Sequence, residues 1–197
     1  MKNGCWYKMA DLLKPVEIGS ARIDILDYTN KELGFHETLS GLQKERYARL
    51  LVNGEVMMSE TPMEHRTNIG FVAHAHGNVL IGGLGLGMIL LAIQHKEEVN
   101  SITVLENNPD VIAAVMPQLP LNSKVRIIEA DAFTWKPDRK FDCVYMDIWP
   151  YINSEIYEQM KQLKRKYGHY LKPISESPKR FNYCWCEHEA KNNYRLW

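Results

Sequence analysis

The stretch Val79-Leu80-Ile81-Gly82-Gly83-Leu84-Gly85-Leu86-Gly87-Met88 decides the fold. It begins as a short, wholly apolar strand, turns through glycines and leads into a helix predicted from Met88 to His95. Glycines directly after a parallel strand let the backbone turn tightly and approach a ligand at the start of the next helix. The stretch therefore predicts a nucleotide-binding loop. Its candidate cofactor-binding residues are Gly82, Gly83, Gly85 and Gly87.

The glycine loop does not match the dinucleotide-binding pattern G-x-G-x-x-G in either reading frame. Met88 and Leu90 stand at the third glycine position of the frames that start at Gly83 and Gly85. This mismatch argues against a dinucleotide-dependent oxidoreductase. A glycine run that only makes a turn remains the structural alternative.

Apolar strands alternate with helices after the loop. Strands are expected over residues 101–105, 125–128, 141–146 and 181–185, and helices over residues 108–116 and 154–167. Apolar strands in regular alternation with helices are typical of a parallel sheet that is covered on both faces. We predict an α/β, doubly wound, mostly parallel, Rossmann-like sheet. About thirty residues follow the last clear helix, so this sheet is expected to be cut short at its C-terminal end.

The first sixty residues have the pattern of antiparallel β-structure. Strands are expected over residues 21–28, 47–52 and 55–58, and Asn53-Gly54 between the last two is typical of a tight hairpin. Thr61-Pro62 then suits the start of a helix that continues to about His74. The predicted organisation is a β-hairpin region over residues 1–60 and a Rossmann-like nucleotide-binding domain over residues 61–197.

Composition and charge narrow the class of partner. Basic and acidic residues number 24 each, whereas nucleic-acid binders usually carry a basic excess. The apolar run over residues 79–93 is shorter than the ~20 residues of a membrane span, and no signal-peptide pattern is visible. We expect a small-molecule substrate, no nucleic-acid or membrane partner, and a cytoplasmic protein with reduced thiols. A homo-oligomer is left open.

Three acidic residues follow three predicted strands at their carboxyl ends. Glu106 lies nineteen residues past Gly87, where a carboxylate can accept hydrogen bonds from ribose hydroxyls. Asp131 is placed to accept from an adenine amino group, with Ala132 beside it, and Asp147 ends the following strand. Parallel strands open into one crevice at this edge, so one site is predicted there. The alternative for Glu106 is a surface acid before a turn.

Residues 79–150 resemble a class I S-adenosylmethionine-dependent methyltransferase, and most of all the spermidine synthase branch of that superfamily. The family's glycine loop, Val-Glu-x-Asp-Pro-Asp-Val-Ile stretch, Gly-Asp-Ala and Tyr-Asp-hydrophobic-Asp strand correspond to residues 82–87, 105–112, 130–132 and 141–147. Their order and spacings agree. The resemblance implies S-adenosylmethionine as cofactor and a transferase activity.

The sequence departs from the spermidine synthase pattern at three positions. The family's loop acid, which holds an aminopropyl ammonium, is replaced by Gly85, and a glutamine near the hairpin is replaced by Met57. Asp-x-x-Asp-Pro is shortened to residues 147–150 and lacks the second acid. These departures argue against polyamine synthesis, which would need Glu60 or Glu64 to supply a missing acid.

Methyl transfer to an unidentified acceptor is the leading functional hypothesis, since such a transfer gains mainly from proximity and orientation. Asp147 is the candidate catalytic residue, which would align or deprotonate an acceptor amine or hydroxyl. Trp149 and Tyr151 are candidates for an aromatic wall, and His65 is a further candidate on the substrate side. A non-catalytic cofactor-binding or interaction protein is one alternative. An aminopropyltransferase that uses decarboxylated S-adenosylmethionine is the other.

Two further patterns receive a structural interpretation. Cys184, Cys186 and His188 form C-x-C-x-H, but structural zinc sites usually place roughly two to four residues between cysteines, so no metal site is predicted. Seven Lys or Arg residues and one acid lie between Lys161 and Arg180, a run interpreted as a solvated face.

Overall fold

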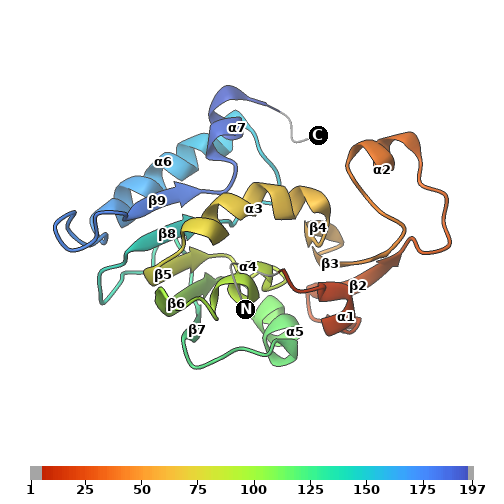
Figure 1. Cartoon of the computed structure of the whole chain (residues 1–197), viewed down its shortest axis with the longest axis horizontal. Coiled ribbons are helices and arrows are strands. Elements are labelled where there is room, and N and C mark those ends of the chain that lie inside the picture. The colour runs from red at the N-terminus through yellow and green to blue at the C-terminus, as the bar shows by residue number, and fades with distance from the viewer. Residues whose placement is uncertain (1–5, 195–197) are drawn as a thin grey trace.

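The computed structural model describes residues 6–194, except for the side chain of residue 36 (Figure 1). The chain forms two sheets, one antiparallel and one parallel. The antiparallel sheet is built from residues before Glu60, and helices cover the parallel sheet that follows. Cys5 lies outside the described residues.

The N-terminal sheet has four antiparallel strands in the order β1-β2-β3-β4. Their bounds are β1 Val16–Ile18, β2 Ala21–Asp27, β3 Arg46–Val52 and β4 Glu55–Ser59. Asn53 and Gly54 both adopt positive φ between β3 and β4, as a tight hairpin requires. The three predicted strands form, and β1 is an addition, because three residues are too few for a periodic pattern. Two short helices accompany this sheet, α1 Met9–Leu12 and α2 Phe35–Leu39.

The second sheet has five parallel strands in the order β7-β6-β5-β8-β9. Their bounds are β5 Gly77–Gly82, β6 Val99–Glu106, β7 Val125–Glu129, β8 Cys143–Met146 and β9 Phe181–Cys184. The order reverses direction at β5, where the chain leaves one half of the sheet and later continues on the other side. This arrangement confirms the predicted doubly wound α/β fold.

Helices precede, connect and follow the strands of this sheet. They are α3 Pro62–His74, α4 Met88–Ile93, α5 Pro109–Val115, the 3-10 turn η1 Met116–Gln118, α6 Ser154–Gly168 and α7 Glu187–Asn192. Asn108 starts α5 by accepting a hydrogen bond from the backbone N–H of Asp110 at 2.9 Å. Asn153 starts α6 in the same way, through the N–H of Ile156. The helix predicted to reach His95 ends two residues earlier.

Strand periodicity divides the core between the two faces of the parallel sheet. Val79 and Ile81 belong to a cluster with apolar residues of α3, α4 and α5. Leu80, between them, points to the other face and joins a cluster with Ile156, Leu163 and other residues of α6. In Figure 1, α6 lies on one side of the sheet and α5 on the other. Both faces are therefore buried, which explains the continuous apolar strands.

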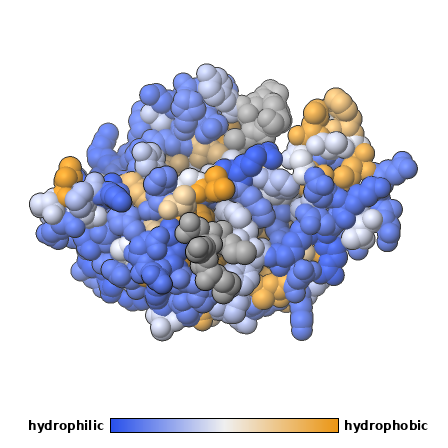
Figure 2. Space-filling model, in the orientation of Figure 1, coloured by the Kyte–Doolittle hydropathy of each residue, from blue (hydrophilic) through white to orange (hydrophobic). Residues whose placement is uncertain are grey.

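The surface is mostly hydrophilic, with apolar side chains gathered on the α2 segment (Figure 2). Phe35 and Leu39 are the most exposed large apolar residues there. Within residues 6–194, no helix combines the length and the apolar character that crossing a membrane would need.

The basic run from Lys161 to Arg180 is not a uniformly solvated face, which corrects the sequence interpretation. Lys172 pairs with Asp142 at 2.8 Å, and Lys164 pairs with Glu187 at 2.6 Å. These cations join α6 and the segment after it to neighbouring elements. Their spacing along the chain gives no sign of the partners, which lie far away in sequence.

Candidate functional site

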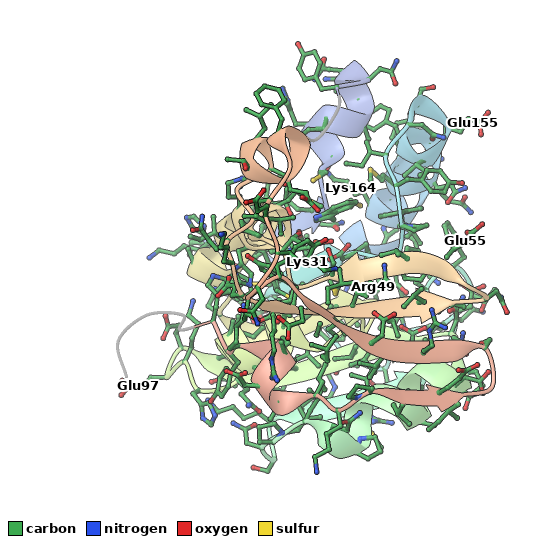
Figure 3. The ribbon with its side chains drawn as sticks, turned by 90° about the vertical axis from the view of Figure 1, so that its right-hand side faces the viewer. Lys31, Arg49, Glu55, Glu97, Glu155 and Lys164 are labelled. Carbon is green, nitrogen blue, oxygen red and sulfur yellow. The ribbon has the colours of Figure 1, made fainter. Side chains whose placement is uncertain are left out.

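A cavity of about 320 Å³ opens where β5, β6 and β8 end. The glycine loop and the acids after these strands line one side, and Met57, Met58 and Leu50 of the N-terminal sheet line the other. Figure 3 shows the N-terminal sheet across the lower half of the molecule, with Arg49 labelled on it, and α6 and α7 above. The size is within the usual range for small-molecule sites, roughly 300 to 1,000 Å³.

Two glycines of the loop have positive φ and lie in close contact with neighbouring residues. Gly83 has φ +92°, and a Cβ there would lie 2.0 Å from the carbonyl oxygen of Asp147. Gly85 has φ +50°, and a Cβ there would lie 2.4 Å from Sδ of Met58. That sulfur accepts the backbone N–H of Leu86 at 3.2 Å, so Met58 packs directly on the loop. Gly83 and Gly85 line the cavity.

The other two predicted loop glycines lie outside the cavity wall. Gly82 is the last residue of β5 and pairs with β6 and β8. Gly87, with φ +79°, precedes α4, and a Cβ there would collide with Leu119. Both glycines support the shape of the loop without lining the cavity.

Glu106 lines the cavity and holds the glycine loop. Its Oε2 accepts the N–H of Leu84 at 3.0 Å, and its Oε1 accepts the N–H of Asn108 at 2.9 Å. A carboxylate oxygen has two lone pairs, so each oxygen keeps one for a further donor. Glu106 can therefore still accept hydrogen bonds from two hydroxyl groups.

Asp131 and Ala132 form a turn at the same edge. Oδ1 of Asp131 accepts the N–H of Phe133 at 2.8 Å. The carbonyl oxygen of Ala132 accepts the buried hydroxyl of Tyr167 at 2.7 Å. Both turn residues line the cavity, next to the wall that contains Glu106.

Asp147 and Glu64 place two carboxyl groups in the cavity wall. Oδ2 of Asp147 is buried without a hydrogen-bond partner in the part of the chain that the structure describes. Burial raises the pKa of Asp147 to about 7. Burial first, and then the charge of Asp147, raise the pKa of Glu64 to about 8. The pair therefore keeps a proton near neutral pH. A cation bound beside the two carboxyl groups would stabilise their charged forms.

The charged side chains that line the cavity are all acidic. Glu64, Glu106, Asp131 and Asp147 line it, and among the described residues no Lys, Arg or His does. A positively charged ligand is therefore favoured by electrostatics, and a net anion is disfavoured.

Glu60 and Glu64, the two acids considered as substitutes for a missing family acid, have different environments in the structure. The carboxylate of Glu60 accepts the N–H groups of Met9, Ala10 and Ala48 at 2.5, 2.8 and 3.3 Å, so it is occupied by α1 and β3. Glu64, on the first turn of α3, faces the cavity.

Of the predicted aromatic wall, Trp149 lines the cavity and Tyr151 does not. Trp149 is buried, and its indole N–H donates to Oε1 of Gln159 on α6 at 2.8 Å. Tyr151 is 60% exposed. His65 lies outside the lining as well, and its ring stacks on Trp6 at 4.7 Å between centroids.

Trp185 is a cavity residue that sequence reasoning missed. It follows β9, is buried, and donates its indole N–H to the hydroxyl of Thr67 on α3 at 3.0 Å. Its position just after a parallel strand was the available signal, the same signal that marked Glu106 and Asp147.

The cysteines beside Trp185 are structural. Cys184 is buried and directs its thiol to the carbonyl oxygen of Met160 at 3.9 Å, and burial raises its pKa to about 12. Burial also raises the pKa of Cys186. His188 is hydrogen-bonded to Asn192 within α7. Thiols that stay protonated are poor nucleophiles.

The chain is similar to several known proteins, although no protein-family model matches it. The chain is 30% identical over 114 residues to polyamine aminopropyltransferase 1 of Streptomyces coelicolor, which covers 50% of this chain and 21% of that protein. Spermidine synthase of Thermotoga maritima superposes with a TM-score of 0.51 at 18% identity, covering 80% of this chain and 53% of that one. The chain has the spermidine synthase fold.

The predicted resemblance to this branch of the class I methyltransferases is confirmed. The N-methyltransferase NodS of Bradyrhizobium japonicum WM9 is also similar, with a TM-score of 0.45 and 16% identity over 58% of this chain and 65% of that one. The chain spans about a fifth of the length of the curated relative and about half that of the spermidine synthase.

Proposed function

We propose that this protein binds S-adenosylmethionine and directs its methyl group to a small amine acceptor held at Asp147 and Glu64. The observation that carries the proposal is the set of four carboxyl groups in one cavity at the carboxyl ends of the parallel strands, with no cation in its described lining. A sulfonium and an alkylammonium are both cations, so this wall favours both reactants.

The residues present suit an adenine nucleoside. Glu106 keeps acceptor capacity beside the loop that starts at Gly83, and Asp131 follows the next strand. The backbone at Gly83 comes so close to Asp147 that any side chain there would collide, so the glycine loop and the end of β8 meet at the cavity. Ligands of open α/β sheets bind at this edge.

The chain's own residues would handle the acceptor. S-adenosylmethionine supplies an activated methyl group when bound. Asp147 and Glu64 would hold the acceptor as an ammonium ion, and the carboxylate of Asp147 would take the proton that frees the nitrogen lone pair. The nitrogen could then bond to the methyl carbon as the methyl–sulfur bond breaks, which would leave S-adenosylhomocysteine. Trp149 and Trp185 would form an aromatic wall that excludes water and suits a cation, and their indole N–H groups are already paired with Gln159 and Thr67.

Calorimetry tests the binding half of the proposal. S-adenosylmethionine and S-adenosylhomocysteine should bind. Glu106→Ala should weaken the binding of both by about 1.5 to 3 kcal/mol, because the variant loses a hydrogen-bond acceptor for the ligand together with the hydrogen bond from the N–H of Leu84. NAD serves as the control ligand. Binding of NAD without binding of either S-adenosyl compound would overturn the cofactor assignment.

A product assay tests the chemistry. Wild-type protein is incubated with S-adenosylmethionine and a set of primary and secondary amines, and methylated product is measured by mass spectrometry. Binding of the cofactor without methylation of any amine would favour the non-catalytic alternative.

Aminopropyl transfer is a second candidate because Glu64 supplies an acid at the cavity. The loop has no acid at Gly85, however, and Sδ of Met58 lies where a side chain at that position would begin. We expect no spermidine from decarboxylated S-adenosylmethionine and putrescine. Spermidine formed at an ordinary enzymatic rate would replace methyl transfer as the assigned reaction.

A further inference from the structure

Helix α6 reaches the turn at residues 131–133 with two consecutive side chains. Nζ of Lys166 donates to the carbonyl oxygens of Ala132 and Phe133, at 2.9 Å each. The hydroxyl of Tyr167 donates to the same carbonyl oxygen of Ala132 at 2.7 Å. In the described part of the chain, neither Lys166 nor Tyr167 lines the cavity.

We propose that Lys166 and Tyr167 are positioning residues that fix the Asp131–Phe133 turn for recognition of a nucleoside base in the cavity. This inference rests on the proposed function, since it assigns a role to the wall that would receive the nucleoside. Lys166 and Tyr167 would act through the turn, without touching the ligand.

The hydrogen bonds leave the turn little freedom. Asp131 closes it from one side by accepting the N–H of Phe133, while α6 holds the carbonyl groups of Ala132 and Phe133 from the other. A turn whose donors and acceptors are satisfied in one arrangement keeps the remaining groups of Asp131 and Ala132 in a constant place. Preorganisation of this kind lowers the entropy cost of binding.

The environment of these two donors supports a specific role. Tyr167 is fully buried, and burial raises its pKa, so the hydroxyl remains a donor. Burial lowers the pKa of Lys166, and no carboxylate of the described residues lies within ion-pair distance of its Nζ. Partial burial costs this ammonium free energy, and the two carbonyl oxygens, the ring of Tyr167 at 5.0 Å and the charge of Asp131 offset that cost, so Lys166 ties α6 to the turn that contains Asp131.

Lys164 provides a matched control on the same helix. It is also a partly buried lysine of α6 (labelled in Figure 3), but its Nζ pairs with Glu187 of α7 at 2.6 Å. Lys164→Met therefore removes an α6 ammonium and a tertiary contact without loosening residues 131–133.

The test compares affinities for S-adenosylhomocysteine and S-inosylhomocysteine, which differ at the 6-position of the base. In Lys166→Met and Tyr167→Phe, affinity for S-adenosylhomocysteine should fall about 5- to 30-fold, as expected for one or two lost hydrogen bonds. The preference for adenine over hypoxanthine should shrink in the same variants, while Lys164→Met keeps both. Melting temperatures are measured alongside, because a merely structural role would lower stability and leave the base preference unchanged.

The outcomes separate the two levels of proposal. Wild-type protein that binds neither nucleoside overturns the proposed function and this inference together. Wild-type binding with an unchanged base preference in both Lys166→Met and Tyr167→Phe overturns the inference alone. The same loss of preference in Lys164→Met would also overturn it, since the effect would then belong to the helix as a whole.

Discussion

At the scale of residues, the Asp147–Glu64 pair is the most consequential feature. Two carboxyl groups that face one cavity, with no cationic side chain in the lining that the structure describes, repel each other when both are charged, and burial prevents water from screening them. Perturbed carboxyl groups of this kind cluster at functional sites. The pair links the charge state of the ligand to the protonation of the protein.

Asp147→Asn should abolish most of the turnover while the cofactor still binds. The amide keeps the shape of the side chain but cannot take up a proton, and a correctly placed general base contributes about 10² to 10⁴ in rate. We expect cofactor affinity within about three-fold of wild type. Turnover, calorimetric affinity and melting temperature are measured on the same preparation. A stable variant with full turnover would remove Asp147 from the mechanism.

Glu64→Gln should change the pH dependence of stability. The unfolded chain loses this proton at an ordinary carboxyl pKa, whereas the folded chain keeps it up to about pH 8, so folding is progressively disfavoured as pH rises between these values. The variant has no carboxyl group at position 64, so it does not lose stability in this way as the pH rises. Its melting temperature relative to wild type should be at least about 3 °C higher at about pH 9 than at about pH 5.

Thermal unfolding at several pH values checks the Glu64 prediction. Glu55→Gln, at an exposed position on β4 (labelled in Figure 3), is the control and should follow wild type. Parallel curves for Glu64→Gln and wild type would show that the buried carboxyl does not titrate in this range.

At the scale of elements, the connection from β5 to α4 depends on close approach to the end of β8. The carbonyl oxygen of Asp147 occupies the place where a side chain at position 83 would begin. The N–H of Asp147 also donates to the carbonyl oxygen of Gly82 at 2.8 Å. The loop and the candidate catalytic residue are thus one local structure.

Gly83→Ala should disrupt this connection. A Cβ 2.0 Å from a backbone oxygen, at φ +92°, forces the loop or the end of β8 to move. We expect a loss of about 2 kcal/mol or more in stability, together with loss of nucleoside binding. Gly70→Ala on α3 is the control, because nothing lies within 4 Å of its Cβ position, and it should be neutral or stabilising. Equal effects at both positions would contradict the argument.

At the scale of the whole molecule, the N-terminal sheet completes the cavity that the parallel sheet begins. Met58 contacts the glycine loop, and Asp110 of α5 accepts the N–H and the hydroxyl of Ser20, at 2.7 and 2.8 Å. Apolar residues of both sheets, including Ile23 and Ile81, belong to the same core cluster. The two regions predicted from the sequence therefore share a core.

A shared core predicts a single unfolding transition. Differential scanning calorimetry of the full chain should show one peak, with a calorimetric enthalpy equal to the van't Hoff enthalpy. A saturating S-adenosyl ligand should raise the whole transition, because its site needs both sheets. Two resolved peaks, of which only one moves with ligand, would show that the sheets unfold independently.

Local patterns in the sequence determined the fold class, the glycine loop and the places of Glu106, Asp131 and Asp147. Strand periodicity, glycine clusters and helix caps act over a few residues, and the edge at which parallel strands end follows from their direction alone. These features could be derived before any contact was known.

The tertiary structure alone decided which other groups reach the cavity. Glu60 and Glu64 are equivalent in the sequence, yet the first is occupied by α1, 50 residues away, and the second faces Asp147. Trp185 is held in the cavity wall by a hydrogen bond to Thr67, which lies 118 residues away in the sequence. Such long-range contacts depend on how whole elements pack, and no local pattern encodes them. The sequence thus determined where the cavity forms, and packing determined its acidic pair, its second tryptophan and the helix that contacts the turn at residues 131–133.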